Sequence, residues 1–304
     1  MMKHQNTSKT KLAIMNAVHD LPVLVARDCG FFKDNGLDVE FVTTPGMANV
    51  TTSHSVVWDS VFDRPLDSVY NEGGIDQFRM CEWGIVKRAV ESAAEGRRAR
   101  KIVALGAAMS SFAIVVRSDS PYYEPEQLKN QAIAVTPNNG SNFVTLKLMQ
   151  GFLANEFIKT TNAGSMLKRI EALRAGKVEA VSLMEPWISV AHKMGLRILI
   201  EGHSTRAEAA GDDLDGPTLR KIFDAQTAAV KVLEKDPTPY IHYLISETGG
   251  LLEPHELQTF RLLNGPPTPY TRERWDDTYN WTVSWDMTIP GATFETIVDN
   301  RAWL

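Results

Sequence analysis

The chain has 304 residues, enough to bury a large hydrophobic core in one to three domains. Its 43% hydrophobic and 23% charged residues are ordinary for a soluble globular protein, and no stretch approaches the ~20 apolar residues of a membrane-spanning helix. The net charge of −5, without a long basic run, argues against nucleic acid or an anionic membrane surface as a partner.

Cysteine and histidine, the residues that build disulfides and many metal sites, are few and scattered. Cys29 and Cys81 cannot form a disulfide framework, and neither lies in a CxxC pair. The seven histidines show no HExxH spacing. We therefore expect no metal site and no cofactor.

The first residues of the chain bear on its location. Residues 1–11 are polar and lack the apolar segment and small-residue cleavage site of a secretion signal. The sequence as it stands predicts a cytoplasmic protein without membrane insertion. If a signal was removed, the protein would instead belong to the periplasm or the cell surface.

The first predicted unit is a strand, a helix, a glycine turn and a second strand. The apolar run 12–15 predicts the strand, and the largely apolar segment 23–29 predicts the helix. Asn35-Gly36 predicts a helix end, because glycine readily adopts the positive φ of a helix C-cap. Apolar and acidic residues alternate over 37–41, which is the periodicity of a strand.

Beyond residue 100, short apolar runs alternate with helical segments. The predicted strands lie at 101–106, 112–116, 131–136, 157–160, 176–183 (which begins with a turn) and 197–200. Predicted helices lie at 143–154, at 165–175 and after Glu185-Pro186-Trp187. This alternation implies parallel crossover connections with helices on both faces, which is an α/β fold. From residue 215 the sequence predicts mainly helices, at 218–234, 239–247, 253–263 and 272–287.

One phrase, GFFKDNGLDVE at residues 30–40, resembles the opening of certain type II periplasmic-binding-protein folds. In the nitrate/sulfonate/taurine and thiamine-pyrimidine (HMP) substrate-binding proteins, the first helix ends in a similar phrase. The resemblance implies a two-lobed clamshell in which each lobe is a mostly parallel sheet flanked by helices, with a helical C-terminal part. Lobe I would combine residues 1–112 and 201–304, and lobe II would cover 113–200. A hinge would then lie near Ser111 and Glu201.

Candidate ligand-binding residues follow from the ends of the predicted strands, where open α/β sheets bind ligands. Asn139-Gly140-Ser141-Asn142 opens a helix, and a helix N-terminus favours an anion, although a plain helix cap explains the same residues. The resemblance implies that this helix start holds the acidic group of the ligand. Glu185 and Trp187 follow another strand and would face the cleft or pack in the core.

The loop after the first strand supplies further candidates, namely Asn16, His19 and Asp20. A histidine there would contact an anionic ligand, act as an acid or base, or simply face solvent. Cys81 is a candidate for ligand contact and for catalysis. It follows residues 78–80, where the resemblance implies the end of the second cleft strand, and it precedes a predicted helix. A thiol at a helix N-terminus can act as a nucleophile, although a free cysteine is often a small core residue.

The segment between Met47 and Asp76 departs from the family pattern. Its His54 is the third candidate catalytic residue, with His19 and Cys81, and long loops lean towards function. Further polar residues of this segment that could form an acid–base group, or simply a solvated loop, are Asp59, Asp63, Arg64, Tyr70 and Glu72.

A short part of this segment, FDRPLDSVYNEGG, resembles the biphenyl sulfinate desulfinase, an enzyme on the same fold. That enzyme places a nucleophilic cysteine in the loop after the first strand. Here the loop reads Asn16-Ala17-Val18-His19-Asp20, so the sequence does not predict desulfination by the same residues.

Two functions remain open, and the sequence does not decide whether the protein is an enzyme. The first is a binding protein of the ABC-transporter substrate-binding type, which closes on an organic anion or a heteroaromatic such as a pyrimidine and delivers it to an ABC permease. The second is a cytoplasmic lyase or hydrolase on the same fold, desulfinase- or decarboxylase-like, which acts on an aromatic acid through Cys81, His19 or His54. Fold alone does not separate them, because function belongs to the site.

Overall fold

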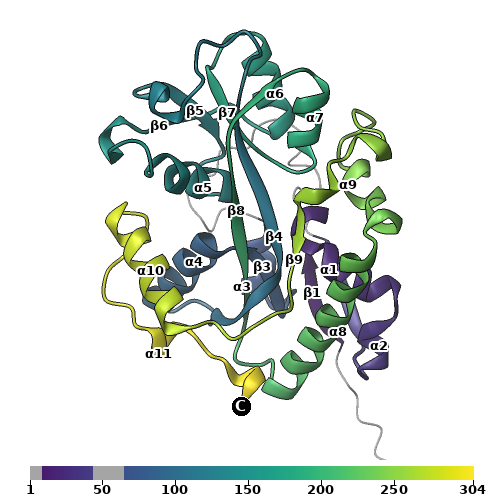
Figure 1. Ribbon diagram of the computed structural model, residues 1–304. Coiled ribbons are helices and arrows are strands. Elements are labelled where there is room, and N and C mark those ends of the chain that lie inside the picture. Colours follow the sequence, from purple (N-terminus) through teal and green to yellow (C-terminus); the bar gives the residue numbers. More distant parts are fainter. Residues whose placement is uncertain (1–8, 44–64) are drawn as a thin grey trace, which may run out of the picture.

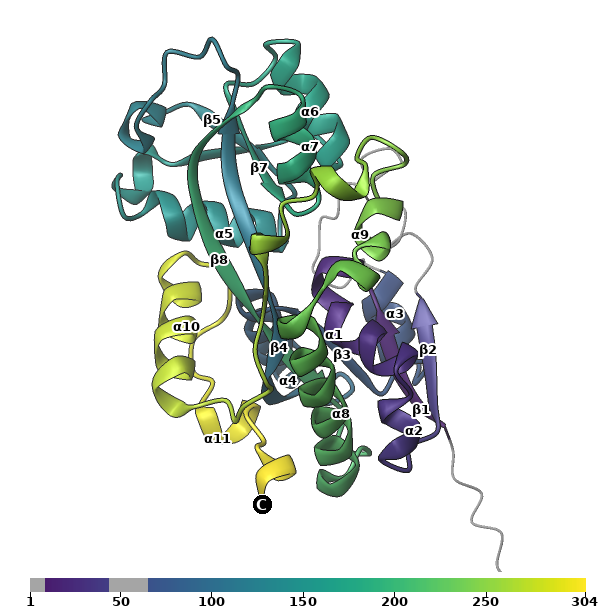
Figure 2. The ribbon, with the colours of Figure 1, turned by 45° about the vertical axis from the view of Figure 1, so that its right-hand side comes forward.

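The computed structural model describes residues 9–43 and 65–304, which form two lobes joined by long strands (Figures 1 and 2). Lobe I begins with β1 (Thr10–Ile14), α1 (Ala17–Asp28), α2 (Phe31–Asp34), β2 (Val39–Thr43), α3 (Pro65–Asn71), β3 (Gln77–Cys81) and α4 (Glu82–Ala94). Lobe II contains β5 (Ala132–Val135), α5 (Gly140–Met149), β6 (Lys159–Asn162), α6 (Met166–Arg174), β7 (Ala180–Met184) and α7 (Trp187–Lys193). The C-terminal part returns to lobe I with α8 (Gly216–Lys235), α9 (His242–Ser246), β9 (Leu262–Asn264), α10 (Arg272–Ser284) and α11 (Phe294–Ile297). Short 3-10 helices lie at Pro125–Leu128, Asn155–Phe157, Thr238–Tyr240, Pro254–Glu256, Thr259–Arg261 and Arg301–Trp303.

Two strands pass from one lobe to the other, β4 (Lys101–Val116) and β8 (Arg197–Ala210). They pair antiparallel and connect the sheets of the two lobes in the order β2-β1-β3-β8-β4-β7-β5-β6, and β9 pairs with β4. Within each lobe three strands are parallel, as predicted: β1 pairs with β2 and β3, and β5 pairs with β6 and β7. The predicted lobe boundaries at residues 112 and 200 fall inside β4 and β8 and stay predictions.

The sequence placed two strands where the structure has one. The predicted strands 101–106 and 112–116 are the two ends of β4, and the residues between them pair with β8 and β9. The intervening segment, Ala107 to Ser111, is built from small residues and a methionine and has no strand-like alternation of its own. Its backbone is held by neighbours that are distant in sequence.

The predicted helix at 253–263 is wrong. The structure has 3-10 turns at Pro254–Glu256 and Thr259–Arg261, followed by β9. The backbone amide of Gln258 donates to Ser189 Oγ of α7 at 3.1 Å, and β9 pairs with residues 108–110 of β4. These tertiary partners favour short turns and a strand over a continuous α-helix.

The sheet of lobe I is covered on both faces, which is why its strands are buried. Phe78 and Met80 of β3 pack in one apolar cluster with Ile85 of α4 and Trp275 of α10. The helices α1 and α8 contribute to a second cluster, which includes Val25. Figure 1 shows α4 and α10 on one side of β3 and α1 and α8 on the other. The predicted glycine turn after α2 is confirmed, because Gly36 has a φ of 70° and its amide donates to Lys33 O.

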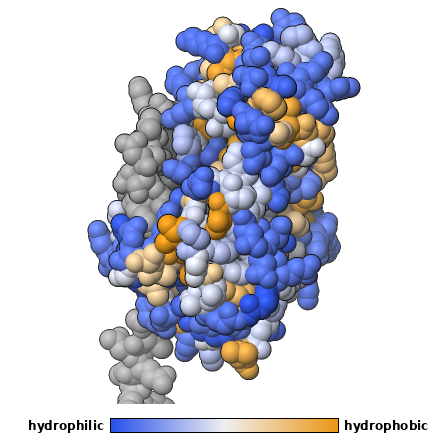
Figure 3. Space-filling view, turned by 90° about the vertical axis from the view of Figure 1, so that its left-hand side faces the viewer, coloured by the Kyte–Doolittle hydropathy of each residue, from blue (hydrophilic) through white to orange (hydrophobic). Residues whose placement is uncertain are grey.

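The surface shows no extended apolar area on the face that Figure 3 draws, where hydrophobic residues form small separate groups among hydrophilic ones. Among the described residues, the large hydrophobic side chains that are exposed are Tyr123, Phe152, Phe260, Ile289 and Leu304. In the same part of the chain, every helix is too short or too polar to cross a membrane.

Candidate functional site

The loop between β1 and α1 is fixed by its own polar side chains. Asn16 caps α1 by accepting a hydrogen bond from the His19 amide at 3.0 Å. Asp20 is fully buried, and its Oδ2 accepts from the amides of Met15 and Asn16. Asn16 and Asp20, both predicted ligand contacts, therefore already hold the loop in place.

A buried charge network continues from this loop onto the sheet. Arg79 of β3 donates to Asp20 Oδ1, to Ala13 O at 3.0 Å and to both carboxylate oxygens of Glu208 at 3.2 Å. Gln77 also donates to Glu208, at 2.9 Å. Both acids of the network are thus occupied by hydrogen-bond donors of the protein itself.

His19 lies close to Arg79 of this network, and only 8% of its surface is exposed. Neither ring nitrogen has a hydrogen-bond partner among the described residues. Burial, followed by the positive charges of Arg206 and Arg79, holds the pKa of His19 well below its usual range. The ring is therefore neutral at neutral pH, with one nitrogen able to donate and one able to accept.

Cys81 ends β3 and caps the N-terminus of α4, as the sequence predicted. It pairs in register with Arg206 of β8, is 4% exposed and takes part in no disulfide. A Cβ atom built on Gly140 would lie 3.6 Å from Cys81 Sγ and 3.4 Å from Phe112 Cζ. The thiol therefore lies where lobe I meets the start of α5 in lobe II.

Arg206 is the residue of this group that sequence reasoning missed. It is fully buried, and its Nη1 donates to Ser204 Oγ at 3.3 Å. Its Nε and Nη2 have no partner among the described residues. Burial lowers the pKa of Arg206 to about 10, so the side chain stays charged at neutral pH. The predicted strand ended at residue 200, and only the pairing of β8 with β3 brings Arg206 to Cys81.

The start of α5 is the predicted anion seat. Asn139 is the N-cap residue and its side chain makes no capping hydrogen bond. Ser141 is buried, and its Oγ accepts from the Thr136 amide at 3.0 Å, which leaves its hydroxyl hydrogen available. Asn142 Oδ1 has no partner within the described part of the chain. Because Gly140 carries no side chain, the first turn of α5 approaches Cys81 and Phe112 closely.

Glu185 and Trp187 lie at the end of β7, in a second polar group. Glu185 is fully buried, its Oε2 accepts from the Ser189 amide at 3.2 Å, and its Oε1 lies 3.5 Å from Arg261 Nη1. Burial raises the pKa of Glu185 to about 7. Trp187 is packed in the core, although its indole nitrogen has no partner among the described residues. Glu185 is thus paired with Arg261, which lies in the segment before β9.

The remaining predicted residues divide between two outcomes. His54 lies outside the described residues, as do Asp59, Asp63 and Arg64. Tyr70 belongs to the core of lobe I, where its hydroxyl donates to Ala99 O, and Glu72 is exposed at the end of α3. Among the described residues, no His, Cys, Asp and Glu side chains gather into a group that could hold a metal ion.

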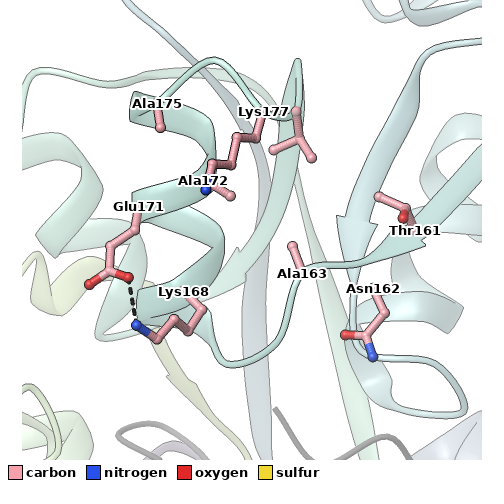
Figure 4. Close-up of a pocket in the computed structure, with 9 residues that line it drawn as sticks. Thr161, Asn162, Ala163, Lys168, Glu171, Ala172, Ala175 and Lys177 are labelled. Atoms are coloured by element: carbon pink, nitrogen blue, oxygen red, sulfur yellow. Dashed lines mark hydrogen bonds and ion pairs between the residues drawn. The ribbon is translucent and has the colours of Figure 1, made fainter. Parts of the chain in front are cut away.

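A separate groove opens on lobe II between β6 and α6 (Figure 4). Thr161 and Asn162 line one side, and Lys168, Glu171 and Lys177 line the other. Lys168 and Glu171 form an exposed ion pair at 3.0 Å. None of the predicted ligand-binding residues contributes to this groove, so the candidate site remains the junction of the two lobes.

Comparison with known proteins reveals the fold. No protein-family model matches the chain, and no curated protein matches its sequence. A Candida albicans protein described as having the generic periplasmic binding protein fold matches with a TM-score of 0.67 at 15% identity, over 97% of each chain. The chain has the periplasmic binding protein fold.

Two further neighbours match the two resemblances seen in the sequence. The periplasmic aliphatic sulphonate binding protein SsuA from Escherichia coli has a TM-score of 0.72 at 14% identity, over 96% of this chain and 91% of that one. The desulfurization enzyme DszB has a TM-score of 0.61 at 12% identity, over 97% and 98%. The fold therefore accommodates both binding proteins and an enzyme, and the choice between them depends on the chemistry of the site.

Proposed function

We propose that the protein binds a small organic anion between its lobes, as a substrate-binding protein of the ABC-transporter type. The observation that carries the proposal is a group of buried polar atoms at the lobe junction without partners among the described residues. These atoms are His19 Nδ1 and Nε2, Arg79 Nη2, Ser110 Oγ, and Arg206 Nε and Nη2.

Buried donors without partners cost free energy, which a ligand with several oxygens would recover. Most of these atoms are donors, and three of them belong to the two guanidinium groups of Arg79 and Arg206, so the complementary ligand is rich in acceptors and negatively charged. The start of α5 adds the positive end of a helix dipole on the opposite lobe. The aliphatic sulphonate in the name of the E. coli neighbour is an anion of this kind. An ABC permease as partner and a cytoplasmic location stay predictions.

The proposal is tested by native mass spectrometry of the purified protein, followed by calorimetry with methanesulfonate, benzenesulfonate, benzoate and nitrate. Benzenesulfonamide serves as the neutral match of benzenesulfonate. We expect one anion per chain, either copurified or bound in the titration, and no binding of the sulfonamide. The absence of any copurified anion together with no binding across the panel would contradict the proposal.

A second candidate function is an enzyme that acts on an aromatic acid, and one observation favours it. Cys81 lies at the N-terminus of α4, opposite Arg206 and against the start of α5, although it also belongs to an apolar cluster with Phe143 and Trp281. If the thiol is a nucleophile, the protein should release sulfite from benzenesulfinate and lose that activity when Cys81 is replaced by serine. Unaltered activity in Cys81→Ser, or none in the wild-type protein, would leave the binding protein as the better account.

A further inference from the structure

Arg206 is a buried arginine that uses only part of its hydrogen-bonding capacity. One nitrogen, Nη1, donates to Ser204 Oγ. The other two, Nε and Nη2, have no partner among the described residues, although the side chain is fully buried. Their N–H groups point in the same direction and form the edge of the guanidinium that binds two oxygens of one acid.

The same protein shows twice what this edge binds. Arg261 donates from Nε and Nη2 to the two carboxylate oxygens of Glu201, at 2.7 and 2.9 Å. Arg274 donates from the same two nitrogens to the two oxygens of Glu82, at 2.8 and 2.6 Å. Arg206 presents the same edge, buried and without a hydrogen-bonded acid among the residues that the structure describes.

Within residues 9–43 and 65–304, two acids near Arg206 already have hydrogen-bond donors. Asp20 accepts from Arg79 through one oxygen and from the amides of Met15 and Asn16 through the other. Glu208 accepts from Arg79 and Gln77. A neighbouring carboxylate would therefore have to give up its present partners to satisfy Arg206.

Arg206 lies beside two residues that contact the start of α5. Its guanidinium carbon lies 5.9 Å from the centre of the Phe112 ring, and Cys81 is its partner across the β3–β8 pair. Phe112 and Cys81 are also the closest neighbours of Gly140, the first residue of α5. An acid seated on Arg206 would thus lie near a helix N-terminus that favours negative charge.

We propose that the Nε–Nη2 edge of Arg206 receives the acidic group of the ligand as a bidentate pair, so that the ligand is a carboxylate or a sulfonate. This inference rests on the proposed binding function and adds the residue that binds the acidic group of the ligand. A neutral amide offers a single acceptor oxygen, and a neutral sulfonamide offers two oxygens without the negative charge, so both should bind at this position much more weakly than the acid.

The test follows the Nε–H resonances of the wild-type full chain labelled with ¹³C and ¹⁵N, assigned by through-bond correlation of each arginine side chain to its own backbone amide. Arg206→Lys, Arg261→Lys and Arg274→Lys serve as checks of the assignment. Benzenesulfonate, benzoate and inorganic sulfate are titrated separately. We expect the Arg206 Nε–H signal to shift and its exchange with water to slow at least tenfold. The Arg261 and Arg274 signals should stay in place, because those edges are already filled by Glu201 and Glu82.

Calorimetry supplies the second arm. Arg206→Lys keeps the positive charge but cannot donate a bidentate pair of hydrogen bonds. We expect its affinity for benzenesulfonate and benzoate to fall at least tenfold. Arg220→Lys, on the exposed face of α8, is the matched control and should bind as the wild type does. Organic probes that bind without moving the Arg206 signal, and with equal affinity for Arg206→Lys, overturn the inference but leave the binding function standing.

If neither organic probe binds, the sulfate titration decides the assignment of Arg206 separately from the proposed function. A sulfate-induced shift confined to Arg206 supports the free edge as an acid-binding position, whereas no shift with any probe overturns it. Because these arms use the wild-type protein, they stay decisive even if Arg206→Lys fails to fold.

Discussion

Replacement of Glu185 by glutamine should make the protein more stable at alkaline pH. The carboxylate is fully buried at the end of β7, and burial raises its pKa from 4.5 to about 7. Glutamine has nearly the same shape and keeps an acceptor for the Ser189 amide. Arg261 loses a neighbour at 3.5 Å but keeps its bidentate pair with Glu201.

The direction of the pH dependence follows from the raised pKa of Glu185. The folded protein holds the Glu185 proton more tightly than the unfolded chain does. This stabilisation is complete below the unfolded pKa of 4.5 and is lost as the pH rises through about 7. At about 1.4 kcal/mol per pKa unit, the elevated pKa of Glu185 lowers the unfolding free energy by about 3 kcal/mol at pH 8 and by about 1 kcal/mol at pH 5, both relative to low pH.

The assay is urea unfolding of wild type and Glu185→Gln at pH 5, 6, 7 and 8, followed by circular dichroism. We expect the stability of the variant relative to wild type to rise by about 2 kcal/mol from pH 5 to pH 8. Taking the difference between the two proteins removes the contribution of His19, whose lowered pKa acts in the opposite direction. A difference that stays constant over this range, or that falls, would refute the reasoning.

Three further predictions concern the lobe junction. Ser141→Glu should weaken binding of an anionic ligand by about 1–3 kcal/mol, because it adds a like charge at the start of α5 and removes a donor, and unchanged affinity in calorimetry would exclude this seat. Cys81→Ser should change the affinity less than about tenfold if the protein is a binder, since one weakly polar contact is worth at most ~1.4 kcal/mol, and a larger loss would give the thiol a direct role. Binding of benzenesulfonate should raise the pKa of His19, because an anion offsets the positive charge of Arg206, so the affinity should increase as the pH falls from 8 to 5. An NMR titration of the His19 ring that gives the same pKa with and without the anion would contradict this.

Much of the local structure could be read from the sequence. The alternation of apolar runs with helical segments predicted the α/β order, because side-chain periodicity reports which face of a strand or helix is buried. The turn at Asn35-Gly36 was predicted correctly, since it depends on a few adjacent residues. The helix predicted at 143–154 exists, but it runs from Gly140 to Met149. The position of Cys81 between a strand and a helix was also predicted, and the structure confirms it.

Long-range pairing was decided only by the tertiary structure. The middle of β4 becomes a strand because β8 and β9 hold its backbone. The segment predicted as a helix forms 3-10 turns and β9, because Ser189 and β4 hold its backbone. Neither partner is near in sequence, so no local pattern marks these elements.

The sequence by itself determined where helices and strands alternate and which short segments begin or end them. It did not determine which charged groups lose water. Arg206 and Glu185 become chemically distinctive only through burial, and that burial is created by strands and helices that are far away along the chain. Periodicity depends only on residues that are adjacent in the sequence, whereas the desolvation of a charge depends on all the residues that surround it in the folded protein.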